Sequence, residues 1–437
     1  MDPLTLTAVL AASIGGAGLG LFSGMVPGIH SNTLASMLLV AFPSMESALS
    51  GILPAESVAI AVCACVMAAS VVHSFVDFVP SVFIGAPDSE DAVSVLPGHR
   101  LVLQGRGMEA VRAAAIGSLV GCAVSILQSV PLQYAMLNGA GPVVEKLTPA
   151  VLVFASGVIV LSEFSGGGGP WALAEFLLAG ALGYMCMELP IPCTGILGEG
   201  TLIFPMLTGL FGIPVLLESS GGNGKLPEQR DGCRDPVGPV PGLKGVVTGC
   251  IAGWFPGITS TVGASMSACF MPDDRPERFV STVASVGTVT SVLSLVTLSV
   301  TGSGRSGSAI VVREIIGDGL DGFMSEGFIL MLISMAVSAV AGYALTIWAG
   351  RMMTKLVKRI DQVLLGRSVI ILLVVLVGLM TGPGGLVVLL SSTVAGFMPT
   401  VFGTGRTVLC GCLILPVLLF RASPTRNSVG YIWKADT

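Results

Sequence analysis

The sequence has few charged residues: they occupy 11% of its 437 positions, whereas hydrophobic residues occupy 53%. Soluble globular proteins carry roughly 25% charged residues, so this chain has too little polar side-chain surface to face water on every side. A net charge of −5 also argues against a nucleic-acid-binding protein. The composition predicts an all-α, multi-pass protein of the cell (plasma) membrane, surrounded mainly by membrane lipid.

Catalytic and nucleotide-binding motifs are missing as well. The chain has no G-x-x-x-x-G-K-[ST] phosphate loop, which argues against ATP-driven pumping by this chain itself. It has three histidines, no H-E-x-x-H, and cysteines without a histidine cluster. These absences argue against a metal centre and make an intramembrane enzyme the weakest hypothesis. We therefore expect no catalytic residues, no metal and no cofactor.

Apolar runs near the ~20 residues that a helix needs to cross lipid recur along the chain. They lie near 4–24, 52–80, 108–137, 148–164, 170–188, 196–217, 243–255, 279–300, 325–350, 367–382 and 385–420. Because Gly and Pro interrupt several of them, we predict a range of about 9–12 membrane segments. The first run follows an N-terminus without a basic region, so we expect it to be a retained membrane segment and no signal peptide.

A polar segment rich in Gly, Pro and charge divides the chain near its middle. We predict an N-terminal transmembrane repeat over 1–220, a linker over 221–241 and a C-terminal transmembrane repeat over 242–437. Basic residues gather at 100–112, 225–244 and 351–367. The positive-inside bias would place these basic segments in the cytoplasm.

A sequence repeat relates the two halves. Residues 18–37 match residues 247–266, within the segment 246–266, without a gap at a shift of 229 positions. The shift pairs Gly16 with Gly245, Gly20 with Gly249, Gly24 with Gly253, Pro27-Gly28-Ile29 with Pro256-Gly257-Ile258, Ser31 with Ser260, and Ala35-Ser36-Met37 with Ala264-Ser265-Met266. A weaker match relates 84–93 to 301–310 at a shift of 217. We therefore expect a two-fold internal repeat with inverted topology.

Each copy places Pro-Gly inside an apolar run and follows it with hydroxyl and amide side chains. Proline interrupts a helix, and Ser, Thr and Asn favour the start of the next one. In lipid, an unwound segment needs protein or a water-filled cavity around it, and transporters bind solutes at such breaks. We expect re-entrant hairpins at 24–42 and 253–271, with helix breaks at Gly24, Pro27, Gly253 and Pro256. The residues expected to bind solute or ion are Gly28, His30, Ser31, Asn32, Thr33, Gly257, Thr259, Ser260 and Thr261.

Two further interpretations stay open. Either copy alone could be a kink whose hydroxyls bond back to their own helix, although two matching copies favour a shared site near the bilayer midplane. His73 and Asp77, four residues apart in an apolar run, form either a proton or ion relay or a buried hydrogen-bonded pair. The remaining acidic residues in apolar surroundings are expected near helix ends, without a function: Glu163, Glu175, Glu188 and Glu199.

The motifs resemble those of the large permease subunit of tripartite tricarboxylate transporters. The resemblance rests on the doubled Pro-Gly motif, on the block 78–121 and on the endings 209–217 and 396–416, which together cover most of the chain in order. It implies a secondary transporter, driven by an ion gradient, that carries citrate or other carboxylates. It also implies two partners, a binding protein and a small membrane subunit. The His-Ser-Asn run at 30–32 departs from the commoner family pattern and indicates a divergent, archaeal branch.

We predict a secondary active transporter (permease) that moves a small organic anion, such as a tri- or dicarboxylate, by symport with Na⁺ or H⁺. The solute would be held between the two Pro-Gly breaks. The alternative is a translocase (flippase) of a polyprenyl-phosphate-type lipid anion, which a lateral opening beside Pro27 and Pro256 would favour. A homodimer is a further assembly to test.

Overall fold

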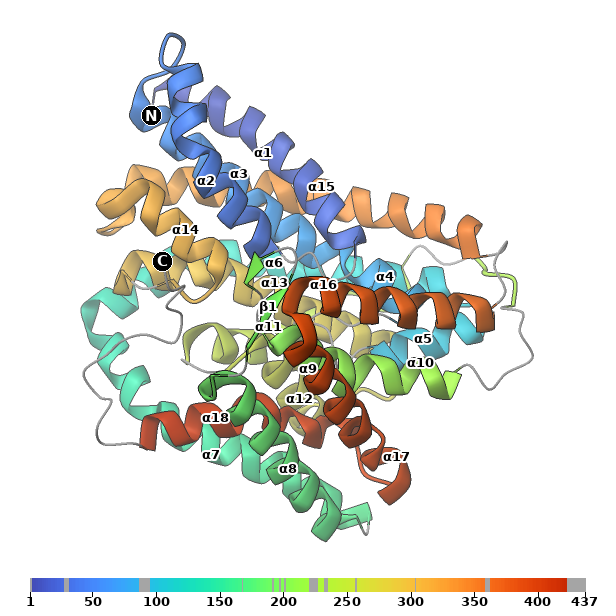
Figure 1. Ribbon diagram of the computed structural model, residues 1–437. Coiled ribbons are helices and arrows are strands. Elements are labelled where there is room, and N and C mark those ends of the chain that lie inside the picture. The colour runs from blue at the N-terminus through green and yellow to red at the C-terminus, as the bar shows by residue number, and fades with distance from the viewer. Residues whose placement is uncertain are drawn as a thin grey trace.

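The computed structural model describes residues 2–26, 31–85, 95–166, 168–190, 192–195, 198–199, 202–219, 227–231, 235–255, 258–302, 304–357 and 362–422. Helices dominate these residues, which confirms the predicted all-α architecture (Figure 1). In the first half the helices are α1 (Pro3–Met25), α2 (Ser31–Leu49), α3 (Ala55–Val76), α4 (Phe78–Ile84), α5 (Val95–Leu103), α6 (Gly107–Ala135), α7 (Gly141–Ser162), α8 (Gly169–Glu188), α9 (Ile203–Leu207) and α10 (Ile213–Ser219). In the second half they are α11 (Val240–Trp254), α12 (Ser260–Phe270), α13 (Pro276–Thr301), α14 (Gly307–Ile316), α15 (Glu326–Val357), α16 (Gln362–Gly396), α17 (Met398–Phe402) and α18 (Gly411–Ala422).

Short elements connect several of these helices. They are the π-helical turns η2 (Met136–Ala140) and η4 (Thr208–Gly212), the 3₁₀ turns η3 (Glu163–Gly166), η5 (Gly317–Leu320) and η6 (Arg406–Cys410), and the antiparallel two-residue strands β1 (Thr194–Gly195) and β2 (Gly198–Glu199). The long helix α16 breaks at Gly382, where φ is +65° and Pro383 follows. This break joins two apolar runs that the sequence analysis treated as separate.

Seven helices among the described residues are long and apolar enough to cross a membrane. They span Pro3–Met25, Ala55–Ile84, Gly107–Val144, Gly169–Glu188, Pro276–Thr301, Glu326–Val357 and Gly366–Phe402. Three shorter apolar helices, Lys146–Ser162, Ile203–Glu218 and Arg406–Leu419, accompany them. The seven candidate spans among the described residues confirm a multi-pass membrane protein, but they are fewer than the 9–12 membrane segments predicted.

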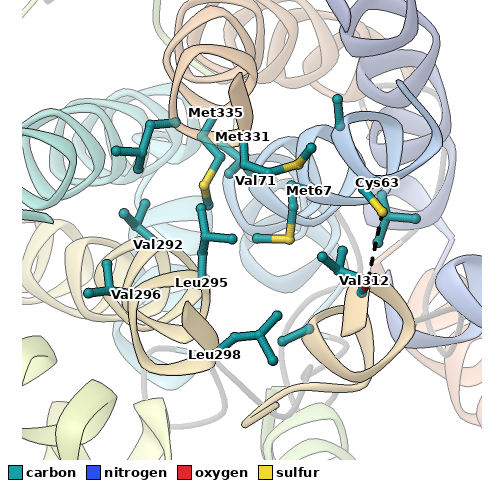
Figure 2. Packing of buried hydrophobic residues seen from close by; sticks show 14 of the residues in the cluster. Cys63, Met67, Val71, Val292, Leu295, Val296, Leu298, Val312, Met331 and Met335 are labelled. Carbon is teal, nitrogen blue, oxygen red and sulfur yellow. Dashed lines mark hydrogen bonds between the residues drawn. The ribbon is translucent and has the colours of Figure 1, made fainter. Parts of the chain in front are cut away.

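The buried apolar side chains form two main groups. The first joins α3, α13, α14 and α15, where Met67, Leu295 and Met331 interlock (Figure 2). The second joins α7, α8, α9, α16 and α18. In Figure 1, α1, α3 and α15 lie toward the top and α7, α8 and α18 toward the bottom, with α11 and α12 between them. Helix α12 therefore stands where the two groups meet, and it contributes Val262 and Met266 to the second.

Close glycine contacts show the relative directions of the matched helices. A Cβ at Gly20 would lie 2.8 Å from the Cβ of Val72, and one at Gly24 would lie 2.9 Å from that of Val76, so α1 runs parallel to α3. Helix α11 runs parallel to α13 in the same manner: the corresponding contacts are Gly249 with Val289 at 2.7 Å and Gly253 with Leu293 at 2.8 Å. The two sets of partners differ by 217 positions, the shift that relates 84–93 to 301–310.

The two matched helix pairs run in opposite directions. Helix α15 is parallel to α3 and antiparallel to α6, and α6 is parallel to α13, so α3 and α13 are antiparallel. The contacts that set these directions are Ser334–Ala64 and Gly342–Phe75 for α15 on α3, Gly350–Val111 and Met324–Gln133 for α15 on α6, and Gly121–Ser285 and Gln133–Ser299 for α6 on α13. Opposite directions are what an inverted repeat requires. The common origin of the two halves stays a prediction.

The described part of the predicted linker packs against both halves. Gln229 is buried; its side chain donates to the carbonyl oxygen of Val102 at 2.9 Å and accepts from the amide of Gly107 at 2.9 Å. Asp231 forms ion pairs with Arg112 of α6 and Arg351 of α15. Helix α11 begins at Val240, inside the predicted linker range 221–241. These contacts tie the centre of the chain to one end of the helical bundle.

Candidate functional site

The first predicted break lies between α1, which ends at Met25, and α2, which begins at Ser31. Helix α3 starts beside the start of α1, because the hydroxyls of Thr5 and Ser57 are 2.8 Å apart. Since α2 leads from the end of α1 to the start of α3, it must reverse the chain direction. The chain thus turns back at the predicted place, but α2 continues through Pro43 to Leu49, beyond the predicted hairpin end at residue 42. Of its predicted residues, Pro27, Gly28 and His30 lie outside the described residues.

The second predicted break lies between α11, which ends at Trp254, and α12, which begins at Ser260. Helix α12 also returns toward the start of its partner: Lys244 Nζ near the start of α11 donates to Asp273 Oδ1 at 2.7 Å, just after α12 ends. The hydroxyl of Thr259 accepts the amide of Val262 at 3.3 Å and so caps the new helix. The remaining two predicted residues here, Pro256 and Gly257, lie outside the described residues.

A short segment before and at the start of α14 contacts both breaks. Arg305 Nη1 donates to the carbonyl oxygen of Gly253 at 3.0 Å, near the end of α11. The amide of Ser308 donates to Asn32 Oδ1 at 3.1 Å, and its hydroxyl is 3.3 Å from the same atom, at the start of α2. Consecutive Cα atoms are about 3.8 Å apart, so Arg305 and Ser308 are separated by at most about 11 Å. Residues 305–308 therefore contact both breaks and connect them.

Two helix ends and one arginine contribute positive charge to this region. Helices α2 and α14 both begin here, and the N-terminal end of a helix carries a partial positive charge. Ser306 caps α14 by accepting the amide of Ala309 at 3.1 Å. Arg305 adds a full charge, which an arginine retains at any physiological pH. Such a combination suits a carboxylate or another small oxyanion.

The predicted hydroxyl and amide residues take different positions. The side chains of Ser31, Ser260 and Thr261 are buried, whereas those of Asn32, Thr33 and Thr259 are partly exposed. Thr259 fits the alternative interpretation of the motif as a local kink, because its hydroxyl accepts a hydrogen bond from its own helix. Asn32 does not: its side chain reaches α14 in the other half of the molecule.

The predicted relay residues lie beside the first break. His73 Nδ1 is 2.9 Å from the hydroxyl of Ser23, near the end of α1. Asp77 caps the C-terminal end of α3, and its amide would lie 3.1 Å from a Cβ at Gly24. Both His73 and Asp77 are buried. A proton or ion relay formed by these two residues next to the first break stays a hypothesis.

The sequence analysis missed Arg305 and Ser308. Both lie in the 301–310 segment, whose weak match to 84–93 was the available signal. An arginine bounded by Gly304 and a Ser-Gly pair, at the end of a long apolar helix, is a sign of a site in a membrane protein. Periodicity within one helix does not reveal that this arginine reaches Gly253, 52 positions earlier. The matching residue in the first half, Asp88, lies outside the described residues.

Comparisons with known proteins agree with this architecture. The model of the tripartite tricarboxylate transporter TctA family matches residues 10–411. An uncharacterised protein of the archaeon Methanocaldococcus jannaschii is 27% identical over 305 residues, which cover 67% of this chain and 70% of that protein. No solved structure matches.

Proposed function

This chain belongs to the tripartite tricarboxylate transporter TctA family, and we propose that it is a secondary transporter that binds a small carboxylate between its two helix breaks. Membership in a family of transport permeases fits a protein without enzymatic activity. The finer parts of the proposal are the site, the class of solute and the coupling ion. Each of these rests on the physical character of the residues described above.

The observation that carries the proposal is the bridge formed by residues 305–308. Arg305 contacts the end of α11, and Ser308 contacts the start of α2. A carboxylate held here would meet a guanidinium and the positive ends of two helices at once. Residues 305–308 also couple the two breaks, because a shift of α14 on solute binding would move both of them together.

The coupling ion belongs to the same proposal. Symport with Na⁺ or H⁺ would supply the energy, since the chain lacks a phosphate loop for ATP. His73 and Asp77, buried beside the first break, are candidates for a proton or ion relay. Members of this family work with a binding protein and a small membrane subunit. We propose the same two partners for this chain.

Uptake into proteoliposomes tests the proposal. The purified chain would be reconstituted with the two partner subunits, where they are encoded with it, and without them. Uptake of radiolabelled citrate, succinate and acetate would be measured under inward gradients of Na⁺ and of H⁺. We expect gradient-dependent uptake of at least one di- or tricarboxylate and no uptake of acetate. A solute with two or three carboxylates can interact with several positive groups of the site at once, whereas acetate has a single carboxylate.

A matched assay with a fluorescent polyprenyl phosphate covers the lipid-translocase alternative. Transbilayer movement of this lipid, together with no uptake of any soluble carboxylate, would contradict the proposal. Carboxylate uptake without lipid movement would support it. Liposomes that contain Arg305→Gln provide the internal control, since the proposal requires that carboxylate uptake depend on this charge.

A further inference from the structure

Glu175 is a carboxylate buried inside a membrane-spanning helix. It lies six residues after the start of α8, and its side chain is 1% exposed. This corrects the expectation that it sits near a helix end without a function. An ionisable side chain inside a membrane segment is costly to bury and is retained mostly for a functional reason.

A second carboxylate lies beside Glu175. The hydroxyl of Thr404 donates to Glu175 Oε2 at 2.5 Å, and the amide of the next residue, Gly405, donates to Glu163 Oε2 at 3.1 Å. Consecutive residues just before η6 therefore hold both carboxylates. A Cβ at Gly405 would lie 2.6 Å from Glu163 Oε1 and 3.4 Å from the hydroxyl of Thr407, so oxygen atoms crowd this point.

One carboxylate oxygen of this cluster lacks a hydrogen-bond partner. Within the described part of the chain, Glu175 Oε1 is buried and has no hydrogen-bond partner. The nearby cation is engaged on one side only: Arg406 Nη2 donates to the two carboxylate oxygens of Glu218 at 2.8 and 2.7 Å, whereas its Nη1 is buried and makes no hydrogen bond to Glu175 or Glu163 among the described residues. A buried carboxylate with an unpartnered oxygen, next to another carboxylate, is stable only if a proton or a cation neutralises part of the charge.

We propose that Glu163, Glu175 and Thr404 form the binding site of the coupling cation, Na⁺ or H⁺; this inference rests on the proposed transport function. Carboxylate and hydroxyl oxygens are the ligands that a hard cation prefers, and a carboxylate pair also binds a single proton tightly. Among the described residues, the charged groups around the site are the two carboxylates themselves, on η3 and α8, and the Arg406–Glu218 pair, on η6 and α10. Arg100 acts on Arg406, and the thiol of Cys269 in α12 lies near Glu163.

The site is linked to the second helix break through η6. The residues that hold both carboxylates lead directly into η6, which ends at Cys410. Cys410 Sγ is 3.0 Å from the hydroxyl of Ser265 in α12. Cation binding at Glu175 would fix the start of η6 and, through its end, the position of α12. This gives the cation a mechanical route to one wall of the proposed solute site.

The test separates cation binding from transport. The melting temperature of the full chain in detergent would be measured in NaCl against choline chloride, and over a series of pH values in choline chloride. We expect the wild type to be stabilised by Na⁺ or by falling pH. Glu175→Gln should lose this response, with an apparent cation affinity lowered at least about tenfold. Glu188→Gln, on the same helix, is the matched control and should respond as the wild type does.

Transport assays on the same variants complete the test. In Glu175→Gln, gradient-driven uptake should fall at least about tenfold, while exchange of labelled for unlabelled solute without a gradient persists. Thr404→Val keeps both carboxylates, so it should fold and bind the cation more weakly; it serves if Glu175→Gln does not fold. An unchanged ion dependence in both variants would overturn the inference and leave transport standing. A cation response that Glu175→Gln abolishes, in a wild type that transports no anion, would support the cation site and overturn its role in transport.

Discussion

Helices α2 and α12 follow the two matched breaks and share the motif Ala-Ser-Met, yet they occupy different surroundings. Met37 of α2 is 61% exposed, whereas the matching Met266 of α12 is 3% exposed. Helix α12 is covered by α7 and η6 as well as by its own partners α11 and α13. Helix α2 packs on α3 and α14, and Val40 on its other side is exposed.

The same sequence motif therefore occurs in two helices that differ in how tightly they are packed. The helix after the second break, α12, is surrounded by other helices, and closely packed protein interiors resist deformation. The first break ends in a helix at the edge of the bundle, where lipid or a partner subunit is the neighbour. We infer that α2 is the more mobile of the two, and that solute binding moves α2 further than it moves α12.

The largest contrast is expected from shortening the matched methionines. Met266→Ala should lower the free energy of unfolding by about 3 kcal/mol, because it leaves a cavity in a packed core. Met37→Ala should change it by less than about 0.5 kcal/mol, since the side chain lies outside that core. Thermal and chemical unfolding in the same detergent would compare them. Equal losses would remove the distinction between the two helices.

A smaller and symmetric effect is expected at the helix contacts that the halves share. Gly20→Ala and Gly249→Ala each place a Cβ within 2.8 Å of a neighbouring valine, so each should cost about 2 kcal/mol by forcing two helices apart. Gly18→Ala, which meets nothing within 4 Å, is the control and should be neutral or slightly stabilising. A tolerated change at one matched site only would weaken the case for a repeat.

The bridge between the breaks is tested by Asn32→Asp. The aspartate keeps an oxygen that accepts from Ser308, so stability should change little, but it adds a negative charge where the solute carboxylate would bind. We expect KM for the carboxylate to rise about tenfold with the maximal rate less affected. Asn32→Ala, which loses the contact with Ser308, should also lower stability by about 1 kcal/mol. An unchanged KM in Asn32→Asp would place the solute elsewhere.

The smallest effect concerns pH and belongs to the first half alone. His99 of α5, outside the membrane-spanning helices, is buried and its Nδ1 is 3.2 Å from the carbonyl oxygen of Val82. Burial lowers the pKa of His99, so the unfolded chain binds the proton more readily than the folded one. Stability should be complete above pH ~6.5 and fall as the pH drops below it.

His99→Gln provides the comparison for this pH dependence. The variant should show a flatter melting temperature between pH ~7.5 and pH ~5.5 than the wild type. The 217-residue shift places Ile316, which does not titrate, opposite His99 in the second half. The same slope in wild type and variant would assign the pH dependence to another group.

The sequence predicted the parts of the site that local chemistry controls. Pro-Gly within an apolar run placed both breaks, and α1, α2, α11 and α12 end and begin around them. The hydroxyl at 259 does cap a helix. These features depend on residues within one turn of each other, so a pattern of neighbours reveals them.

The parts that the sequence did not predict depend on contacts between distant segments. The exposure of Met37, the reach of Arg305 to Gly253 and the pairing of Glu175 with Thr404 are set by which helices pack together. Thr404 and Glu175 are 229 positions apart. Period and composition describe one helix at a time, so they gave Glu175 no role and left Arg305 unnoticed.

The central claim is that Arg305 supplies the charge that binds a carboxylate between the two breaks. The most direct measurement is equilibrium binding of the best-transported carboxylate to purified wild type, Arg305→Gln and Arg313→Gln. The control is Arg313, which lies within α14, a few residues after Arg305, and forms ion pairs with Asp318 and Asp321. We predict at least about tenfold weaker binding for Arg305→Gln and unchanged binding for Arg313→Gln. Wild-type affinity in a folded Arg305→Gln would contradict the account.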